Sequence, residues 1–100
     1  MKKKYKFYKN KRTRNHPSIE LFATEKIWNN LEVTSNPTET GRYIKLKHPV
    51  SKNIKQSYVR KYVRKDPIRT RGNLLSNYEL SDEDMKQIEN YLDQHFNKKS

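Results

Sequence analysis

Residues 81–96, with the sequence SDEDMKQIENYLDQHF, predict one amphipathic helix at the end of a chain that otherwise reads as strands. The apolar residues recur every three or four positions, which places them on one helical face. They are Met85, Ile88, Leu92 and Phe96. Ser81 is suited to cap the first turn, and Asp84 three residues later completes a capping-box-like pattern. Two interpretations of the acidic side of this helix stay open: a docking face for a partner, or the solvated back of a packed helix.

Upstream of the helix, four segments show the alternation or the β-branched and aromatic content of strands. The predicted strands are 18–24, 27–34, 42–47 and 57–65. The last of them contains the tetrapeptide Tyr-Val-Arg-Lys twice, at 58–61 and 62–65. A four-residue repeat also stacks on a helix, so a short helix is the alternative there. The turn-forming residues of 35–41 predict a loop.

The N-terminal segment is strongly basic. Residues 1–17 carry eight Lys and Arg side chains and no acid. We predict a basic arm over 1–15, in which Tyr5, Phe7 and Tyr8 either form a short edge strand or stay loose, followed by one domain over 16–100. A chain of 100 residues buries a small core, so a homodimer is expected.

The formal net charge of +12 predicts a polyanionic partner, with RNA or DNA first, against the simpler interpretation that the charge only keeps the protein in solution. The absence of cysteine excludes disulfides and thiolate zinc sites and fits a cytoplasmic protein. No apolar run approaches the roughly 20 residues that cross a bilayer, so no membrane association is expected. The chain has only two glycines, so it cannot form a glycine-rich phosphate-binding loop. Its three histidines do not have the sequence spacing of a metal-binding motif, so we predict no cofactor and no metal.

Basic and hydroxylated residues flank the first two core strands. His16, with Arg12 and Arg14, precedes the first strand, and Thr34 and Ser35 end the second. If these strands lie side by side and antiparallel, the start of one meets the end of the other.

Such a set suits metal-free cleavage of RNA, which needs a base, an acid and groups that hold the phosphate. His16 can transfer a proton near neutral pH. Arg12, Arg14 and Arg69 can neutralise the phosphate, and Thr34 and Ser35 can bond its oxygens. The alternative is structural: His16 as a turn residue beside Pro17, and Thr34 with Ser35 as a strand end that makes side-chain turns.

The order of five short motifs resembles one known family. The motifs are RNHPSI at 14–19, LEVTS at 31–35, IRT at 68–70, LL at 74–75 and LSDEDM at 80–85. In this order they resemble the MazF/PemK family of toxin endoribonucleases, which have an SH3-like barrel with a C-terminal helix. The resemblance implies a mainly β fold of that kind, with α+β content.

The resemblance also implies a site and partners. It puts Thr34 at the phosphate and leaves proton transfer to His16 or Arg14, and it implies a homodimer and an acidic antitoxin that covers the basic face. The chain departs from the family in three ways: His16 stands where the family has an arginine before the proline, 55–65 is more basic, and the glycine-rich first loop is missing.

The leading prediction is therefore a toxin-like RNA-binding protein that acts as a metal-independent endoribonuclease. The predicted nucleic-acid contacts are Arg12, Ser35, Lys45, Arg60, Arg64 and Arg69. The alternatives are a non-catalytic nucleic-acid-binding module of phage or mobile-element origin, and a regulator that acts through protein contacts.

Overall fold

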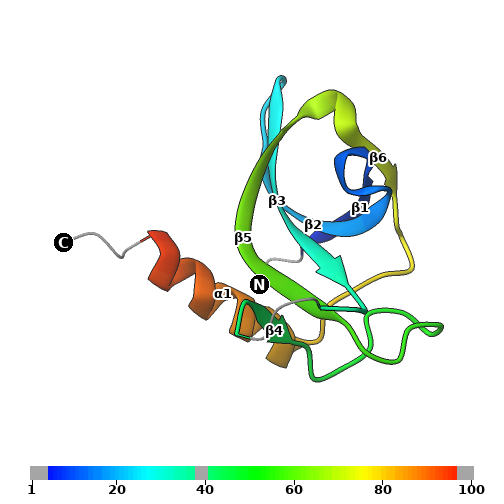
Figure 1. Cartoon of the computed structure of the whole chain (residues 1–100), viewed down its shortest axis with the longest axis vertical. Coiled ribbons are helices and arrows are strands. Elements are labelled where there is room, and N and C mark those ends of the chain that lie inside the picture. Colours follow the sequence, from blue (N-terminus) through cyan, green and yellow to red (C-terminus); the bar gives the residue numbers. More distant parts are fainter. Residues whose placement is uncertain (1–4, 38–40, 97–100) are drawn as a thin grey trace.

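The computed structural model describes residues 5–37 and 41–96, which form one sheet and one long helix (Figure 1). The strands are β1 Lys6–Asn10, β2 His16–Ala23, β3 Ile27–Thr34, β4 Tyr43–Lys45, β5 Tyr58–Pro67 and β6 Arg71–Leu74. Two short 3-10 turns, η1 Lys11–Thr13 and η2 Ile68–Thr70, precede β2 and β6, and α1 spans Asp82–Phe96. Lys2, Lys3 and Lys4 of the predicted basic arm, and part of the predicted loop 35–41, lie outside the described residues.

The six strands form one antiparallel sheet in the order β4-β5-β3-β2-β1-β6. This confirms a mainly β fold with a C-terminal helix. The outer strands β4 and β6 do not pair with each other within the described residues, so the sheet keeps two edges. Closure into an SH3-like barrel therefore does not follow from the strand pairing.

The prediction that the N-terminal segment forms a loose arm or an edge strand is wrong for residues 6–10, which form β1. Residues 6–10 pair with β2 on one side and with β6 on the other, so they form an interior strand and neither a loose arm nor an edge. The physical reason is Phe7, which is fully buried opposite Ile19. A boundary between arm and domain at residue 15 therefore cuts through the β1–β2 hairpin.

The other strand predictions are confirmed with small shifts. β3 has the predicted bounds, and β5 settles the choice for the repeated tetrapeptide in favour of a strand. In the first predicted strand, Ile19 and Leu21 are buried but Ala23 is exposed. A register shift between Glu20 and Phe22 interrupts the alternation there.

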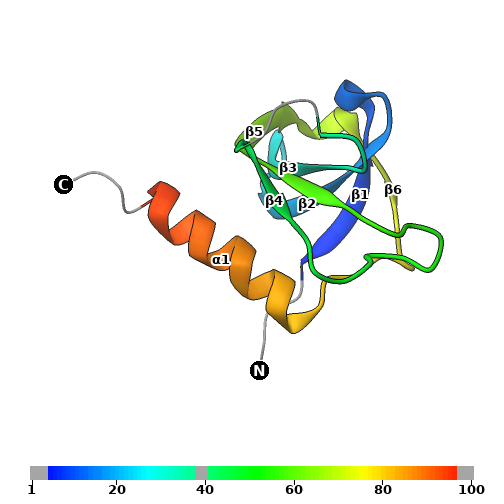
Figure 2. The ribbon, with the colours of Figure 1, turned by 60° about the horizontal axis from the view of Figure 1, so that its bottom comes forward.

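The apolar core lies on one face of the sheet. The strand registers align Phe7, Ile19, Leu31 and Val63 in one row across four neighbouring strands. Met85 and Ile88 of α1 pack against this cluster, together with buried residues of the connecting segments: Leu46, Val50 and Leu80. Figure 2 shows α1 running along the side of the sheet next to β4.

α1 begins as the sequence predicts, because the Ser81 hydroxyl accepts a hydrogen bond from the Asp84 amide at 3.1 Å. The Asp84 carboxylate accepts from the backbone amides of Lys47 at 2.7 Å and His48 at 3.0 Å, and so ties the segment after β4 to the helix. The predicted apolar face is buried at Met85 and Ile88, whereas Phe96 is 56% exposed. Within the described part of the chain, no helix has the length and apolarity to cross a membrane.

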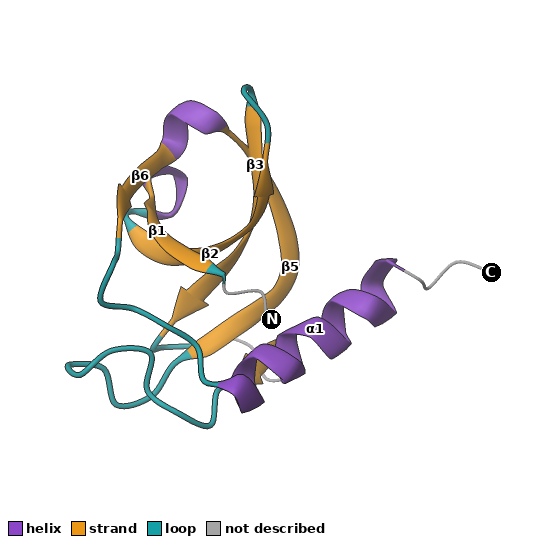
Figure 3. Cartoon of the chain, turned by 180° about the vertical axis from the view of Figure 1, so that it is seen from behind, coloured by secondary structure: helices purple, strands orange, loops and turns teal. Residues whose placement is uncertain are grey.

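The opposite face of the sheet, which we call the polar face, carries buried polar side chains beside the fully buried Trp28 and curls over itself. Asn10 of β1 donates a hydrogen bond to Asp66 of β5 at 3.1 Å, although two strands separate them in the sheet. Three strand spacings in a flat sheet would put them about 14 Å apart. The sheet must therefore bend around this face, as Figure 3 shows from behind.

Candidate nucleic-acid interface

The polar face has a closed part, which we call the buried polar cluster: Asn10, Asn30, Arg64 and Asp66. Asp66 is 3% exposed and accepts hydrogen bonds from both asparagines at 3.1 Å and from the Arg64 guanidinium at 3.0 and 3.2 Å. Burial alone would raise the pKa of Asp66, but these donors together lower it below its usual value. Beside the cluster, the Trp28 indole donates to the Thr70 hydroxyl at 3.1 Å.

The same face is open toward the start of β5. We call this part the open face, and it consists of His16, Glu32, Thr34, Tyr58, Arg60 and Tyr62. Tyr58 pairs with Thr34, and the register between β3 and β5 shifts just beyond this pair. Arg60 lies 3.8 Å from Glu32, and the Tyr62 ring centre lies 5.6 Å from the Arg60 guanidinium, which places both on this side. Lys45 pairs with Tyr58 from the edge strand β4 and extends the open face.

His16 and Thr34 meet at one end of the open face, as the sequence predicts. β2 and β3 are antiparallel, with Ser18 opposite Glu32, so the start of β2 lies beside the end of β3. A cleft of about 290 Å³ forms there. Its lining combines polar and apolar side chains: His16, Pro17, Val33, Thr34, Ser35, Asn36, Ile54, Ser57 and Tyr78.

Glu32 joins this site to Arg60, and the sequence interpretation missed it. Its Oε2 lies 3.4 Å from His16 Nδ1, and its Oε1 lies 3.8 Å from Arg60 Nη1. The Glu32 side chain is only 18% exposed, so solvent screens these contacts less than it would on an open surface. Its position two residues before Thr34 in the same strand was the available signal, because that spacing puts both on one face.

A carboxylate beside one imidazole nitrogen orients the ring and leaves the other nitrogen for a proton transfer. The cleft therefore holds an imidazole and the Thr34 and Ser35 hydroxyls, and the Glu32 carboxylate, which does not line the cleft, lies 3.4 Å from the imidazole. This set can accept a proton and hydrogen-bond an anionic oxygen, which are the needs of phosphodiester cleavage without a metal.

The predicted arginines do not all lie here. Arg12 and Arg14 are exposed in the turn between β1 and β2, where Arg14 adopts a left-handed backbone with φ of 59°, and neither lines the cleft. Arg69 is exposed in η2, beyond the far end of β5. Arg64 binds Asp66 in the buried polar cluster, so we assign it to the fold rather than to a ligand.

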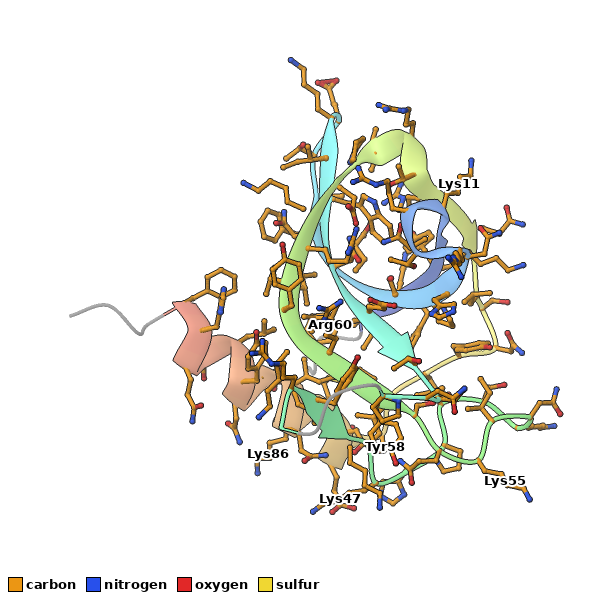
Figure 4. All side chains as sticks on the ribbon, in the orientation of Figure 1. Lys11, Lys47, Lys55, Tyr58, Arg60 and Lys86 are labelled. Atoms are coloured by element: carbon orange, nitrogen blue, oxygen red, sulfur yellow. The ribbon has the colours of Figure 1, made fainter. Side chains whose placement is uncertain are left out.

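Figure 4 shows Arg60 between β5 and the end of β3, whereas the labelled lysines lie on several sides of the molecule. These are Lys11, Lys47, Lys55 and Lys86. These four lysines therefore do not gather on one face, and the arrangement of Arg60 with Glu32 and His16 distinguishes the open face from their positions.

The remaining histidines are elsewhere. His48 bonds Glu83 at 2.8 Å, which lowers the pKa of that carboxyl, and His95 stacks against Tyr91 and Phe96 near the end of α1. No group of three His, Asp or Glu side chains within residues 5–37 and 41–96 is placed to hold a metal ion.

Comparison with known proteins does not place the chain in a family. No protein-family profile matches it, and no match is found among curated protein sequences or solved structures.

Proposed function

We propose that this protein binds RNA on its open face and cleaves it in the cleft that holds His16 and Thr34, without a metal ion. The observation that carries the proposal is the meeting of His16, Thr34 and Ser35 in one cleft, with Glu32 at the imidazole. The net charge of +12 supports a polyanionic ligand. The motif order that resembles the MazF/PemK toxins points to the same chemistry and leaves the homodimer and the acidic antitoxin as predictions.

The proposed reaction is a transfer within the RNA chain. His16 accepts the proton of a ribose 2′-hydroxyl, and the 2′-oxygen attacks the adjacent phosphorus. The bond from phosphorus to the 5′-oxygen breaks, and that oxygen takes a proton from solvent. The products are a 2′,3′-cyclic phosphate and a 5′-hydroxyl. Thr34 and Ser35 hydrogen-bond the phosphoryl oxygens, and Arg60 stabilises the negative charge that develops.

The test is cleavage of a long single-stranded RNA in EDTA by the wild type, His16→Ala and Thr34→Ala. His48→Ala is the matched control, because the two histidine side chains are equally exposed, at 48% and 47%, and His48 lies at α1 rather than in the cleft. We expect cleavage by the wild type and by His48→Ala, and a loss of about 100-fold or more in His16→Ala. Intact RNA with the wild type, beside a nuclease that cuts it, would contradict cleavage.

One observation favours a second function, which is RNA binding without cleavage. His16 stands where the MazF/PemK family, which the motif order resembles, has an arginine, so the site lacks this arginine. An electrophoretic shift of RNA by the wild type with no cleavage product would select this second function.

A further inference from the structure

Tyr62 is exposed on the open face, and the proposed cleavage reaction gives it no role. Tyr62 belongs to the middle of β5, and the residue is 55% exposed. The Arg60 guanidinium lies 5.6 Å from the centre of the Tyr62 ring, within the range of a cation–π contact.

Basic side chains surround this ring. A shallow depression of about 490 Å³ is lined by Gly41, Arg42, Arg60, Lys61 and Tyr62. The Lys61 amide donates to the Arg42 carbonyl at 2.9 Å, which fixes the segment before β4 beside β5. The described lining residues include three cations and no acid, so an anionic group is attracted to this side of the ring.

Arg60 lines the depression and reaches toward His16 of the cleft through Glu32. It contacts the Tyr62 ring, and it lies 3.8 Å from Glu32, whose other oxygen faces His16. The depression and the cleft therefore have separate linings, and Glu32 lies between Arg60 of the depression and His16 of the cleft.

We propose that Tyr62 stacks on an unpaired base of single-stranded RNA, while Lys61 binds the phosphate beside it. This rests on the proposed RNA-binding function and names its substrate class. A base can lie on a tyrosine ring only when it has left its neighbours in a helix, and the deep, narrow major groove of duplex RNA does not admit side chains. Aromatic rings are a recurring platform for unpaired bases of single-stranded RNA.

The experiment measures fluorescence anisotropy with a labelled 12-nucleotide oligouridine and a 12-base-pair RNA duplex, in 0.1 M salt. The oligouridine carries 2′-O-methyl groups, so it has no 2′-hydroxyl for the proposed cleavage. The proteins are the wild type, Tyr62→Ala, Tyr62→Phe and Phe96→Ala. Phe96 is the matched control, since it is 56% exposed but lies on α1. Thermal unfolding checks that each variant is folded, and all should be, because both side chains are exposed.

We expect Tyr62→Ala to weaken binding of the oligouridine about ten-fold or more, and Tyr62→Phe and Phe96→Ala to stay within about two-fold of the wild type. Duplex binding should be weaker and unchanged by Tyr62→Ala. An unchanged affinity of Tyr62→Ala for the oligouridine, or an equal loss for both RNAs, would overturn the stacking site alone. A wild type that binds neither RNA would overturn the proposed function, and the stacking site with it.

Discussion

The tetrapeptide Tyr-Val-Arg-Lys occurs twice in β5, and its two copies have different surroundings. In the first copy, Arg60 is 41% exposed and its nearest carboxylate oxygen, on Glu32, is 3.8 Å away. In the second copy, Arg64 is 19% exposed and makes two hydrogen bonds to the buried Asp66. The tyrosines show the opposite trend, since Tyr58 is partly buried and Tyr62 is exposed.

The difference comes from the curl of the sheet. Near Asp66, β1 and β5 approach each other over the polar face, and Asn10 bonds across to Asp66. Near Thr34, the face stays open and the cleft forms. Identical residues therefore stabilise the fold at one end of β5 and are available to a ligand at the other.

The largest expected effect separates the two arginines. Arg64→Met leaves the Asp66 carboxylate buried without its cation, and breaking such a pair costs about 3–5 kcal/mol in the free energy of unfolding. Arg60→Met removes only an exposed ion pair, which is worth about 0–1 kcal/mol. Urea titration measures both. Equal losses in the free energy of unfolding of the two variants would show that Arg64 stabilises the fold no more than Arg60 does.

A smaller effect is expected from the pH dependence of the buried polar cluster. The pKa of Asp66 is lower in the fold than its value of about 3.9 in an unfolded chain. Its contribution to stability is therefore complete above about pH 4 and is lost as the pH falls through the folded pKa. Urea titrations between pH 2 and pH 6 should show stability falling with acid in the wild type and a shallower fall in Asp66→Asn.

Glu83→Gln is the control for that series. The pKa of Glu83 is also lowered, chiefly by the hydrogen bond from His48, but this carboxyl lies on the surface. We expect a smaller change of slope than in Asp66→Asn. A larger change in Glu83→Gln would place the acid sensitivity at the start of α1 rather than in the buried polar cluster.

Asn30→Leu tests the neutral members of the buried polar cluster. Asn30 donates to Asp66 and accepts from Asn10, each at 3.1 Å. Its loss removes two buried hydrogen bonds, each worth about 0.5–1.5 kcal/mol, while Asn10 and Asp66 keep their bond to each other. We therefore expect a loss of about 1–3 kcal/mol in the free energy of unfolding, measured by urea titration. The matched control is Asn36→Leu in the exposed loop after β3, which should change stability by less than about 0.5 kcal/mol.

Glu32→Gln has the smallest expected effect on stability, within about 0.5 kcal/mol, because its partners are both partly exposed. Its effect on RNA distinguishes binding from cleavage. Loss of the negative charge should tighten RNA binding a few-fold. It should also slow cleavage, since His16 loses its orienting carboxylate. Tighter binding with unchanged cleavage would show that Glu32 lies near the RNA but does not orient His16 for cleavage.

The candidate site was predictable in part. The adjacency of the first two core strands followed from antiparallel pairing, and it brings His16, Thr34 and Ser35 together as expected. Glu32 was missed, although its position two residues before Thr34 in the same strand puts both on one face. Arg14 and Arg69 share the charge of Arg60, yet they lie away from the cleft, since charge alone does not fix position.

The sequence by itself determined the elements whose signals are local. The bounds of β3, the strand over the repeated tetrapeptide and the capped start of α1 all follow from periodicity and from side chains a few residues apart. The tertiary structure alone decided the interior position of β1, the contact of Asn10 with Asp66, and which copy of the repeat is buried. These depend on strand order and on the curl of the sheet, which arise from contacts between residues far apart in the chain.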